Sequence, residues 1–395
     1  LHLLVDDVIA VMEDFYPDLN NRPDDLKKLI LNEEKRFAKT LESGEKLLLE
    51  AIDNNVGDKL DGGVVFKLYD TYGFPVELTE EIASEKGLKV DLDGFEKELE
   101  AQKERARSAR QKVESMTSQV EAILNFKEES EFLYDVFEVE AKITGIFVDD
   151  QRVSSFTGEG LVATDKTPFY AESGGQVSDT GWINDGIVIN VSKANAGQHL
   201  HHVKTDETLR EGDIVKLKIN RDRRILIRKN HSAVHLLHAA LHELVGEHVN
   251  QAGSYVDEDY FRLDFTHIER LDAKKLKEIE SLVNDWIAKS LPIKTDIMDI
   301  NSAKASGAMA LFGDTYGEMV RVVSMGDVSK ELCGGTHAIN TGEIGVFKIE
   351  SEESVGSGVR RIVGKTSLGA YQVFTELKED LDLISQYLKL SPQKS

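Results

Sequence analysis

Two short histidine-containing segments restrict the structures open to this chain of 395 residues. Residues 230–238 read NHSAVHLLH, and residues 331–337 read ELCGGTH. Through and beyond the first segment, apolar side chains recur at helical spacing, at Ala233, Leu236, Leu237, Ala240, Leu241 and Leu244. This pattern predicts an amphipathic helix, whereas the two adjacent glycines of the second segment predict a tight turn.

The polar residues of the two segments predict a metal site. His231 and His235 are four residues apart, a spacing at which two imidazoles on a helix can bind one ion. Cys333 and His337 supply a thiolate and a third imidazole from the turn. Because three nitrogens and one thiolate suit Zn²⁺, we expect a zinc site made of these four residues.

The spacing alone leaves the choice of histidines open. His238 and His242 have the same separation and lie on the same predicted face as the first pair. The first pair is preferred because Asn230 is the expected N-cap, and a substrate arriving by a loop would meet that end of the helix first. Taken one at a time, the histidines also fit a solvated helix face, and Cys333 fits a small buried side chain.

Composition indicates a soluble, cytoplasmic protein of several domains. The chain is too long for one core, and its 41% hydrophobic and 30% charged residues are ordinary for a globular protein. It has no apolar run of membrane-spanning length, and its single cysteine fits a reducing compartment. The net charge of -23 opposes general nucleic-acid binding, but basic runs at residues 103–112 and 221–229 are candidate local contacts with RNA.

Periodicity along the chain predicts an α+β multidomain fold. Residues 1 to about 60 are expected to be helical, with Pro23 at a helix start, and the aromatic stretch 66–75 is expected to form a packed elbow. A helical connector should follow, and short β runs extend from about Tyr134 to about residue 220. After the histidine helix we expect strands at 261–265 and 319–323, a helix at 273–290 and a last amphipathic helix.

The HSAVH helix and the SKELCGGTH turn resemble the editing domain of the alanyl-tRNA synthetases. Three further stretches agree: TPFYAESGGQ at 167–176, FKLYDTYGFP at 66–75 and GVRRI at 358–362. The second of these lies outside the editing domain in that family, so the resemblance favours the synthetase over its free-standing editing relatives. The chain is then expected to be a fragment that lacks the class II catalytic core with its ATP site.

The resemblance implies four parts. Residues 1–132 would be the tail of the helical tRNA-recognition region with its connector, and residues 133–225 a small β-barrel. Residues 226–366 would be the α/β zinc-containing editing module, and residues 367–395 the start of a helical C-terminal domain through which the full-length protein self-associates. The implied partner is the acceptor end of tRNA(Ala), with no membrane contact.

The implied activity is zinc-dependent hydrolysis of mischarged Ser-tRNA(Ala) and Gly-tRNA(Ala), as part of an alanine-tRNA ligase and without aminoacylation by this fragment. The candidate catalytic residues are Glu172, Gln176 and Gln251. The candidate substrate-binding residues are Gly174, Gly175, Val234, Gly334, Arg360 and Arg361, of which the two arginines are expected to contact phosphate. Position 234 is often threonine in the family, so Val234 is expected to alter the selectivity between serine and alanine.

Two other functions remain open at this stage. The chain is also consistent with a non-catalytic zinc-containing module that only binds tRNA, or with a metallohydrolase of small esters that is unrelated to the synthetases. The zinc itself is consistent with a catalytic, a substrate-orienting or a structural role, because four protein ligands usually form a closed site.

Overall fold

The computed structural model describes residues 1–16, 19, 23–55, 57–103, 121–194, 197–309, 317–356 and 358–387. The chain divides into two compact units, Leu1–Ser118 and Gln119–Ser395, which are described separately. Apart from Lys103, the first basic run lies outside the described residues. Among the helices of these ranges, none is long and apolar enough to cross a membrane.

The first unit is helical, as predicted. Its elements are η1 (His2–Leu4), α1 (Val5–Met12), α2 (Pro23–Asp53), β1 (Lys59–Leu60), α3 (Gly62–Tyr72), α4 (Val76–Glu85) and β2 (Lys89–Val90), and residues 92–103 are also helical. The aromatic stretch forms the expected elbow: α3 ends at Gly73 in the left-handed conformation (φ 66°), and Pro75 precedes α4. Between them, Phe74 is buried in the core of this unit.

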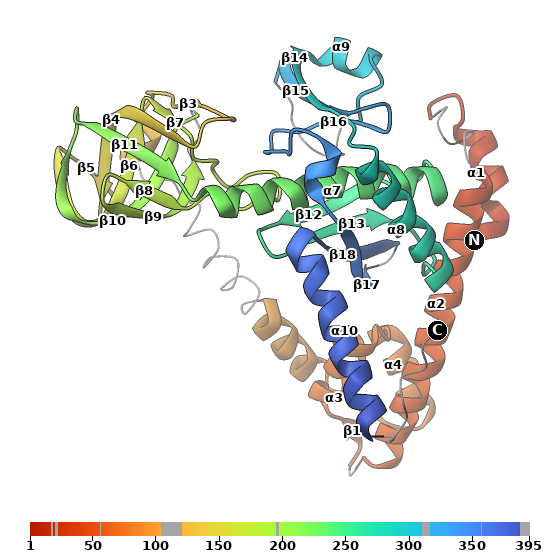
Figure 1. Cartoon of the computed structure of the whole chain (residues 1–395). Helices are drawn as coiled ribbons and strands as arrows, with labels where there is room; N and C mark the ends of the chain where they lie inside the picture. The colour runs from red at the N-terminus through yellow and green to blue at the C-terminus, as the bar shows by residue number, and fades with distance from the viewer. Residues whose placement is uncertain are drawn as a thin grey trace. The chain divides into compact units, whose positions relative to one another are not determined.

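The second unit begins with a closed β-barrel (Figure 1). Its strands are β4 (Glu138–Val148), β6 (Ser155–Thr164), β8 (Gly181–Ile183), β9 (Gly186–Lys193), β10 (His199–Arg210) and β11 (Ile214–Ile219). They pair antiparallel in the order β11-β8-β9-β10-β6-β4, and β11 pairs back with β4 to close the barrel. The short strand β5 (Gln151–Val153) extends β4 outside this ring, and β3 (Glu131–Phe132) pairs with β7 (Lys166–Thr167). Alternate side chains fill the interior.

Helix α7 (Arg221–Leu244) follows the barrel directly. The predicted N-cap at Asn230 is wrong, because Asn220 caps the helix by accepting from the backbone nitrogen of Arg223. The amide of Asn230 instead bonds the carbonyl of Asp257 and the hydroxyl of Thr366, since a buried amide requires partners. The basic run 221–229 is therefore the first part of the helix, and the histidines lie in its middle.

The rest of the second unit is an α/β module around α7. One sheet has the order β12 (Gln251–Val256), β13 (Phe261–Thr266), β18 (Val359–Thr366) and β17 (Phe347–Gly356), and another has the order β14 (Ile293–Asp299), β15 (Met319–Met325) and β16 (Ser329–Leu332). The remaining helices are α6 (Glu121–Leu124), α8 (Ala273–Ala288), α9 (Ile300–Ala305), η3 (Thr341–Ile344) and α10 (Ser367–Tyr387). The strands predicted at 261–265 and 319–323 are present as β13 and β15, and the helix predicted at 273–290 and the last amphipathic helix are present as α8 and α10. The mixed α/β multidomain class is confirmed.

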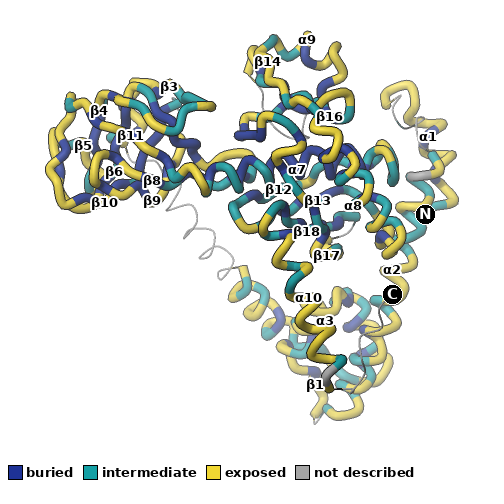
Figure 2. Tube along the Cα trace, in the orientation of Figure 1, coloured by how far each residue is buried: buried dark blue, intermediate teal, exposed yellow. Residues whose placement is uncertain are grey.

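Helix α7 is buried on all sides in its central part, from Asn230 to Leu241 (Figure 2). It contacts α8, η3 and strands of both sheets, so its histidine face is enclosed rather than solvated. Near its start, the fully buried Arg224 pairs with Asp179 of the segment that precedes β8. A buried pair of this kind fixes the helix against the barrel, because either partner alone would leave an uncompensated charge.

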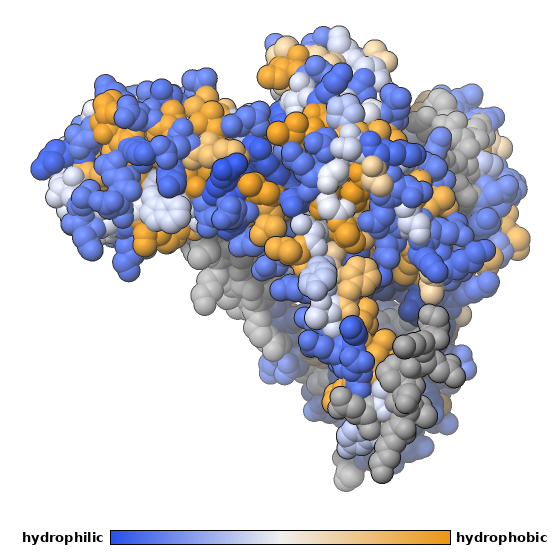
Figure 3. All heavy atoms as spheres, viewed as in Figure 1, coloured by the Kyte–Doolittle hydropathy of each residue, from blue (hydrophilic) through white to orange (hydrophobic). Residues whose placement is uncertain are grey.

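Helix α10 keeps an apolar surface exposed. Figure 3 shows hydrophobic side chains along this helix, and those with more than half of their area exposed are Leu368, Tyr371, Leu377, Leu381, Leu383, Ile384 and Tyr387. Self-association through this region therefore stays a prediction, consistent with the exposure but not tested by it.

Candidate metal centre

The structure brings the four predicted ligands together. The metal-binding atoms of His231, His235, Cys333 and His337 all lie within 4.8 Å of one another. The Sγ atom of Cys333 is 3.5 Å from Nε2 of His231 and 3.3 Å from Nε2 of His337. In a tetrahedral zinc site, nitrogen and sulfur ligands are separated by about 3.6 Å, given the usual bond lengths. The residues therefore fit a zinc ion in both chemistry and spacing.

Helix α7 and a glycine turn position the ligands. One helical turn stacks the rings of His231 and His235, with centroids 5.5 Å apart. The segment from Cys333 to His337 follows β16 and closes on this pair of rings. At Gly335 a Cβ atom would lie 2.0 Å from Cε1 of His231, so only glycine permits the approach.

Two hydrogen-bonding partners orient the outer nitrogens of the ligands. Nδ1 of His231 is 2.7 Å from Oε1 of Gln176, which also accepts from the backbone nitrogen of Thr336 at 2.9 Å. Nδ1 of His337 is 3.2 Å from the hydroxyl of Ser232. In both rings the partner at Nδ1 leaves Nε2 directed to Cys333, which is how outer contacts select the binding nitrogen in metal sites.

The third histidine ligand contacts a buried carboxylate. Nδ1 of His235 is 2.8 Å from Oε2 of Glu331, and Nδ1 of His238 is 3.2 Å from the other oxygen of the same carboxylate. His238 shares the Glu331 carboxylate with His235 but lies outside the group of four, so the structure gathers the first histidine pair with Cys333 and His337. No role for Glu331 is predicted by the sequence patterns, although this residue stands two positions before Cys333.

A second missed residue, Arg321, holds the glycine turn in place. Its NH1 donates to the carbonyl oxygens of Cys333 and Gly335, both at 2.8 Å. The guanidinium carbon lies 4.2 Å from the ring centroid of Tyr134, whose hydroxyl donates to the carbonyl of Gly334. Strand β15 and the segment before the barrel therefore both support the turn.

Burial and mutual charge set the protonation of the cluster. Burial alone would raise the pKa of the Cys333 thiol, but the neighbouring histidines outweigh burial and hold that pKa well below its ordinary value. Burial lowers the pKa of His337 to about 3. Burial opposes the charge on His235, yet Glu331 and Cys333 raise the pKa of this residue to about 10. These shifts favour the thiolate form of Cys333 and the protonated form of His235 beside Glu331.

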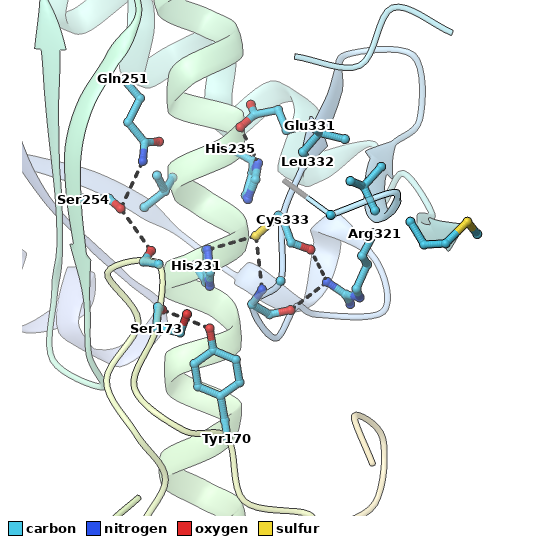
Figure 4. A pocket seen from close by; sticks show the side chains of 17 residues that line it. Tyr170, Ser173, His231, His235, Gln251, Ser254, Arg321, Glu331, Leu332 and Cys333 are labelled. Carbon is cyan, nitrogen blue, oxygen red and sulfur yellow. Dashed lines mark hydrogen bonds and ion pairs between the residues drawn. The ribbon is translucent and has the colours of Figure 1, made fainter. Parts of the chain in front are cut away.

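A cavity of about 310 Å³ adjoins the cluster (Figure 4). His231, His235 and Cys333 form one side of it, and Val234 and Val320 contribute apolar surface. Polar groups come from Gln251, Ser254, Ser173 and the glycines 174 and 334. The amide nitrogen of Gln251 donates to the hydroxyl of Ser254 at 3.1 Å, and that hydroxyl donates to the carbonyl of Gly174. Three separate segments therefore supply the polar wall.

The other predicted site residues do not line this cavity. Glu172 is exposed on the loop before it, and Gln176 is fully buried as the partner of His231. Gly175 packs on Ser254 so closely that a Cβ would lie 2.4 Å from its carbonyl oxygen. Arg360 pairs with Glu352, and Arg361 pairs with Asp264 at 2.7 Å. The two arginines are thus held by carboxylates on the sheet.

Two family models and several curated relatives match this chain. A family model described as "tRNA synthetases class II (A)" matches residues 1–223, and one described as "Threonyl and Alanyl tRNA synthetase second additional domain" matches residues 320–363. The chain is 46% identical to an alanine--tRNA ligase of Streptococcus thermophilus, over 100% of the chain and 46% of that relative. It is 45% identical to the alanine--tRNA ligase of Lactococcus lactis, over 99% of the chain and again 46% of the relative. The chain thus spans about half the length of these relatives.

Replacement of Glu331 by glutamine is expected to weaken Zn²⁺ binding by about 10- to 100-fold, the usual effect of losing a carboxylate that orients a histidine ligand. Competition with a chromophoric chelator measures the affinity. Glu243, an exposed residue of the same helix, provides the matched Glu243→Gln control, which should bind as the wild type does. Equal Zn²⁺ affinities for the wild type and both variants would show that Glu331 does not support the metal site.

Loading the metal-free protein with Zn²⁺ at pH 7 is expected to release at least one proton. His235 is protonated below its pKa of about 10 and must lose that proton to bind the ion. The affinity should therefore fall as the pH is lowered, by about tenfold per unit for each proton released. Calorimetric titration in buffers of different ionisation enthalpy measures the proton count, and a count of zero would contradict the pairing of His235 with Glu331.

Proposed function

Because this chain belongs to the alanyl-tRNA synthetase family, we propose that it hydrolyses the ester bond of tRNA(Ala) charged with serine or glycine. The single observation that carries this proposal is the small cavity beside the clustered histidines and cysteine. At about 310 Å³ it suits an aminoacyl group, since it is at the lower end of the range for small-molecule pockets.

Such a hydrolysis is needed because a single binding site has a limited ability to discriminate between similar amino acids. A site that accepts alanine cannot exclude the smaller glycine, and an apolar pocket rejects an added hydroxyl by only about a hundredfold. A second site that removes the wrong amino acid from the tRNA raises the overall selectivity. This site must recognise the serine hydroxyl, or the absence of a side chain, and must spare the alanine ester.

The residues that would hold Zn²⁺ are His231, His235, Cys333 and His337. When bound there, the ion supplies a positive charge that favours the negative charge developing on the ester carbonyl during attack by water. Each of the three imidazoles is oriented by one contact to its outer nitrogen. The contacting residues are Gln176 for His231, Ser232 for His337 and Glu331 for His235.

The walls of the cavity would select the amino acid. Val234 is 4% exposed, lines the cavity and lies between the two ligand histidines on α7, which places it to contact the amino-acid side chain. The hydrogen-bonded pair Gln251 and Ser254 contributes polar groups to the cavity wall, and these groups can bond a hydroxyl or an α-amino group. The absence of a side chain at Gly334 leaves open space beside the turn, into which the ester can fit.

The decisive experiment compares serine release from Ser-tRNA(Ala) with alanine release from Ala-tRNA(Ala), using the whole chain. Serine should be released in the zinc-loaded protein and retained after chelation or in Cys333→Ala, while alanine stays attached in every case. His242→Gln serves as the control, because His242 is on the same helix but outside the cluster. Zinc-loaded protein that binds the tRNA without releasing serine would instead establish a binding module.

A Val234→Thr variant is expected to release serine faster relative to alanine. Threonine has nearly the shape of valine and adds one hydroxyl to the cavity wall, which can bond the serine hydroxyl. A net hydrogen bond is worth about 1 kcal/mol, so the ratio of kcat/KM values should change by roughly five- to tenfold. Unchanged ratios for the two esters would show that position 234 does not contact the side chain.

A further inference from the structure

A second, larger cavity adjoins the metal centre. It has a volume of about 910 Å³, and Arg321 lines both cavities. The turn after β16 also contributes to both, with residues 333–335 in the first cavity and residues 336–339 in the second. A chain that entered the second cavity would therefore pass close to the metal ligands.

The second cavity has a basic lining in an acidic protein. Arg221, Arg228, Lys229 and Arg321 face it, against the carboxylates of Asp135 and Glu343. The whole chain carries a net charge of -23. An excess of positive groups at one cavity is thus a local feature that attracts an anionic ligand there, while the remaining surface repels it.

Some of these cations are already engaged within the protein. Arg321 binds the carbonyls of the glycine turn, and Lys229 donates to the hydroxyl of Ser367 at 3.0 Å. Arg221 is exposed at the first position of α7. Arg228, two turns further along the same helix face, is partly engaged: its NH2 group pairs with Asp135 at 3.2 Å, while its Nε has no hydrogen-bond partner among the described residues. These two arginines are the groups best placed to bind a ligand.

An aromatic ring holds both of these arginines. Their guanidinium carbons lie 5.2 Å and 5.4 Å from the ring centroid of Phe137. Arg228 is 8% exposed; one of its terminal nitrogens donates to the carbonyl of Tyr134, and its Nε has no hydrogen-bond partner among the described residues. A buried donor without a partner is costly unless a ligand or water satisfies it. Stacking on the ring also fixes the guanidinium groups before a ligand arrives.

We propose that this cavity binds backbone phosphates of the single-stranded 3′ end of an RNA whose terminal ester occupies the smaller cavity. The inference rests on the proposed function. If the terminal ester is bound in the first cavity, the RNA strand attached to it must extend out of that cavity. Arginine donors on an aromatic ring suit a single strand, which offers both phosphates and bases. Arg221 and Arg228 are then the phosphate-binding residues, and Phe137 positions them.

The test measures binding of uncharged RNA rather than hydrolysis. The probe is a fluorescent hairpin of the tRNA(Ala) acceptor stem with its single-stranded 3′ end, and its dissociation constant for the whole chain is measured at several salt concentrations. Each phosphate contact to a single strand contributes about 0.7 to the slope of log affinity against log salt. Arg221→Gln should weaken binding and reduce that slope by about 0.7.

Arg210→Gln is the matched control, because it removes the same charge from an exposed position on the barrel that does not line the cavity. Its slope should equal that of the wild type. A blunt hairpin without the 3′ strand should show no dependence on Arg221. The proposal is overturned if Arg221→Gln leaves the slope unchanged, if the blunt hairpin shows the same loss, or if polyglutamate at equal ionic strength displaces the RNA as effectively as unlabelled hairpin.

These outcomes are independent of catalysis. If Arg221→Gln leaves the salt slope unchanged while the wild-type protein releases serine, the proposed function stands and only the phosphate site is excluded. Conversely, an Arg221-dependent slope in a protein that releases no serine would retain the RNA site and remove the proposed hydrolysis.

Discussion

Close packing between helix α7 and the turn from Cys333 to His337 is the contact around which the second unit is arranged. It requires glycine at position 335, where a Cβ would lie 2.0 Å from the ring of His231. It also requires Arg321 to hold the turn carbonyls and Gln176 to bridge His231 and Thr336. The centre therefore joins helix α7, strand β15, the turn after β16 and the loop that carries Gln176 before β8. Through that loop the barrel takes part in building the centre.

Burial of so many ionisable groups is possible because each has a specific partner. A lone buried charge would cost several kcal/mol, and it would be avoided by a shifted pKa or by unfolding. Here the positive His235 faces the negative Glu331, and the Cys333 thiolate faces the histidines. The same balance would suit a cation site, because a bound ion would stand in place of the proton on His235. The stability of this region and the binding of an ion would therefore depend on the same side chains.

The sequence was sufficient for the parts of this account that depend on regular spacing. The i, i+4 histidines and the Cys-Gly-Gly-Thr-His turn identified all four clustered residues, and apolar periodicity located most helices and strands. It was insufficient where a contact joins distant segments: the partners Glu331 and Arg321 are ordinary charged residues until the fold brings them to the turn. The helix start was misplaced because Asn230 resembles a cap, while its amide serves a buried contact instead.

The most direct test of the account is the metal content and coordination of the purified whole chain, measured by elemental analysis together with X-ray absorption at the zinc edge. The account predicts one zinc per chain with three nitrogen ligands at about 2.0 Å and one sulfur ligand at about 2.3 Å. The sulfur signal should disappear in Cys333→Ala and persist in His242→Gln. A zinc-reconstituted protein with no stoichiometric ion, or with a coordination shell that lacks sulfur, would contradict the metal centre and the proposal that depends on it.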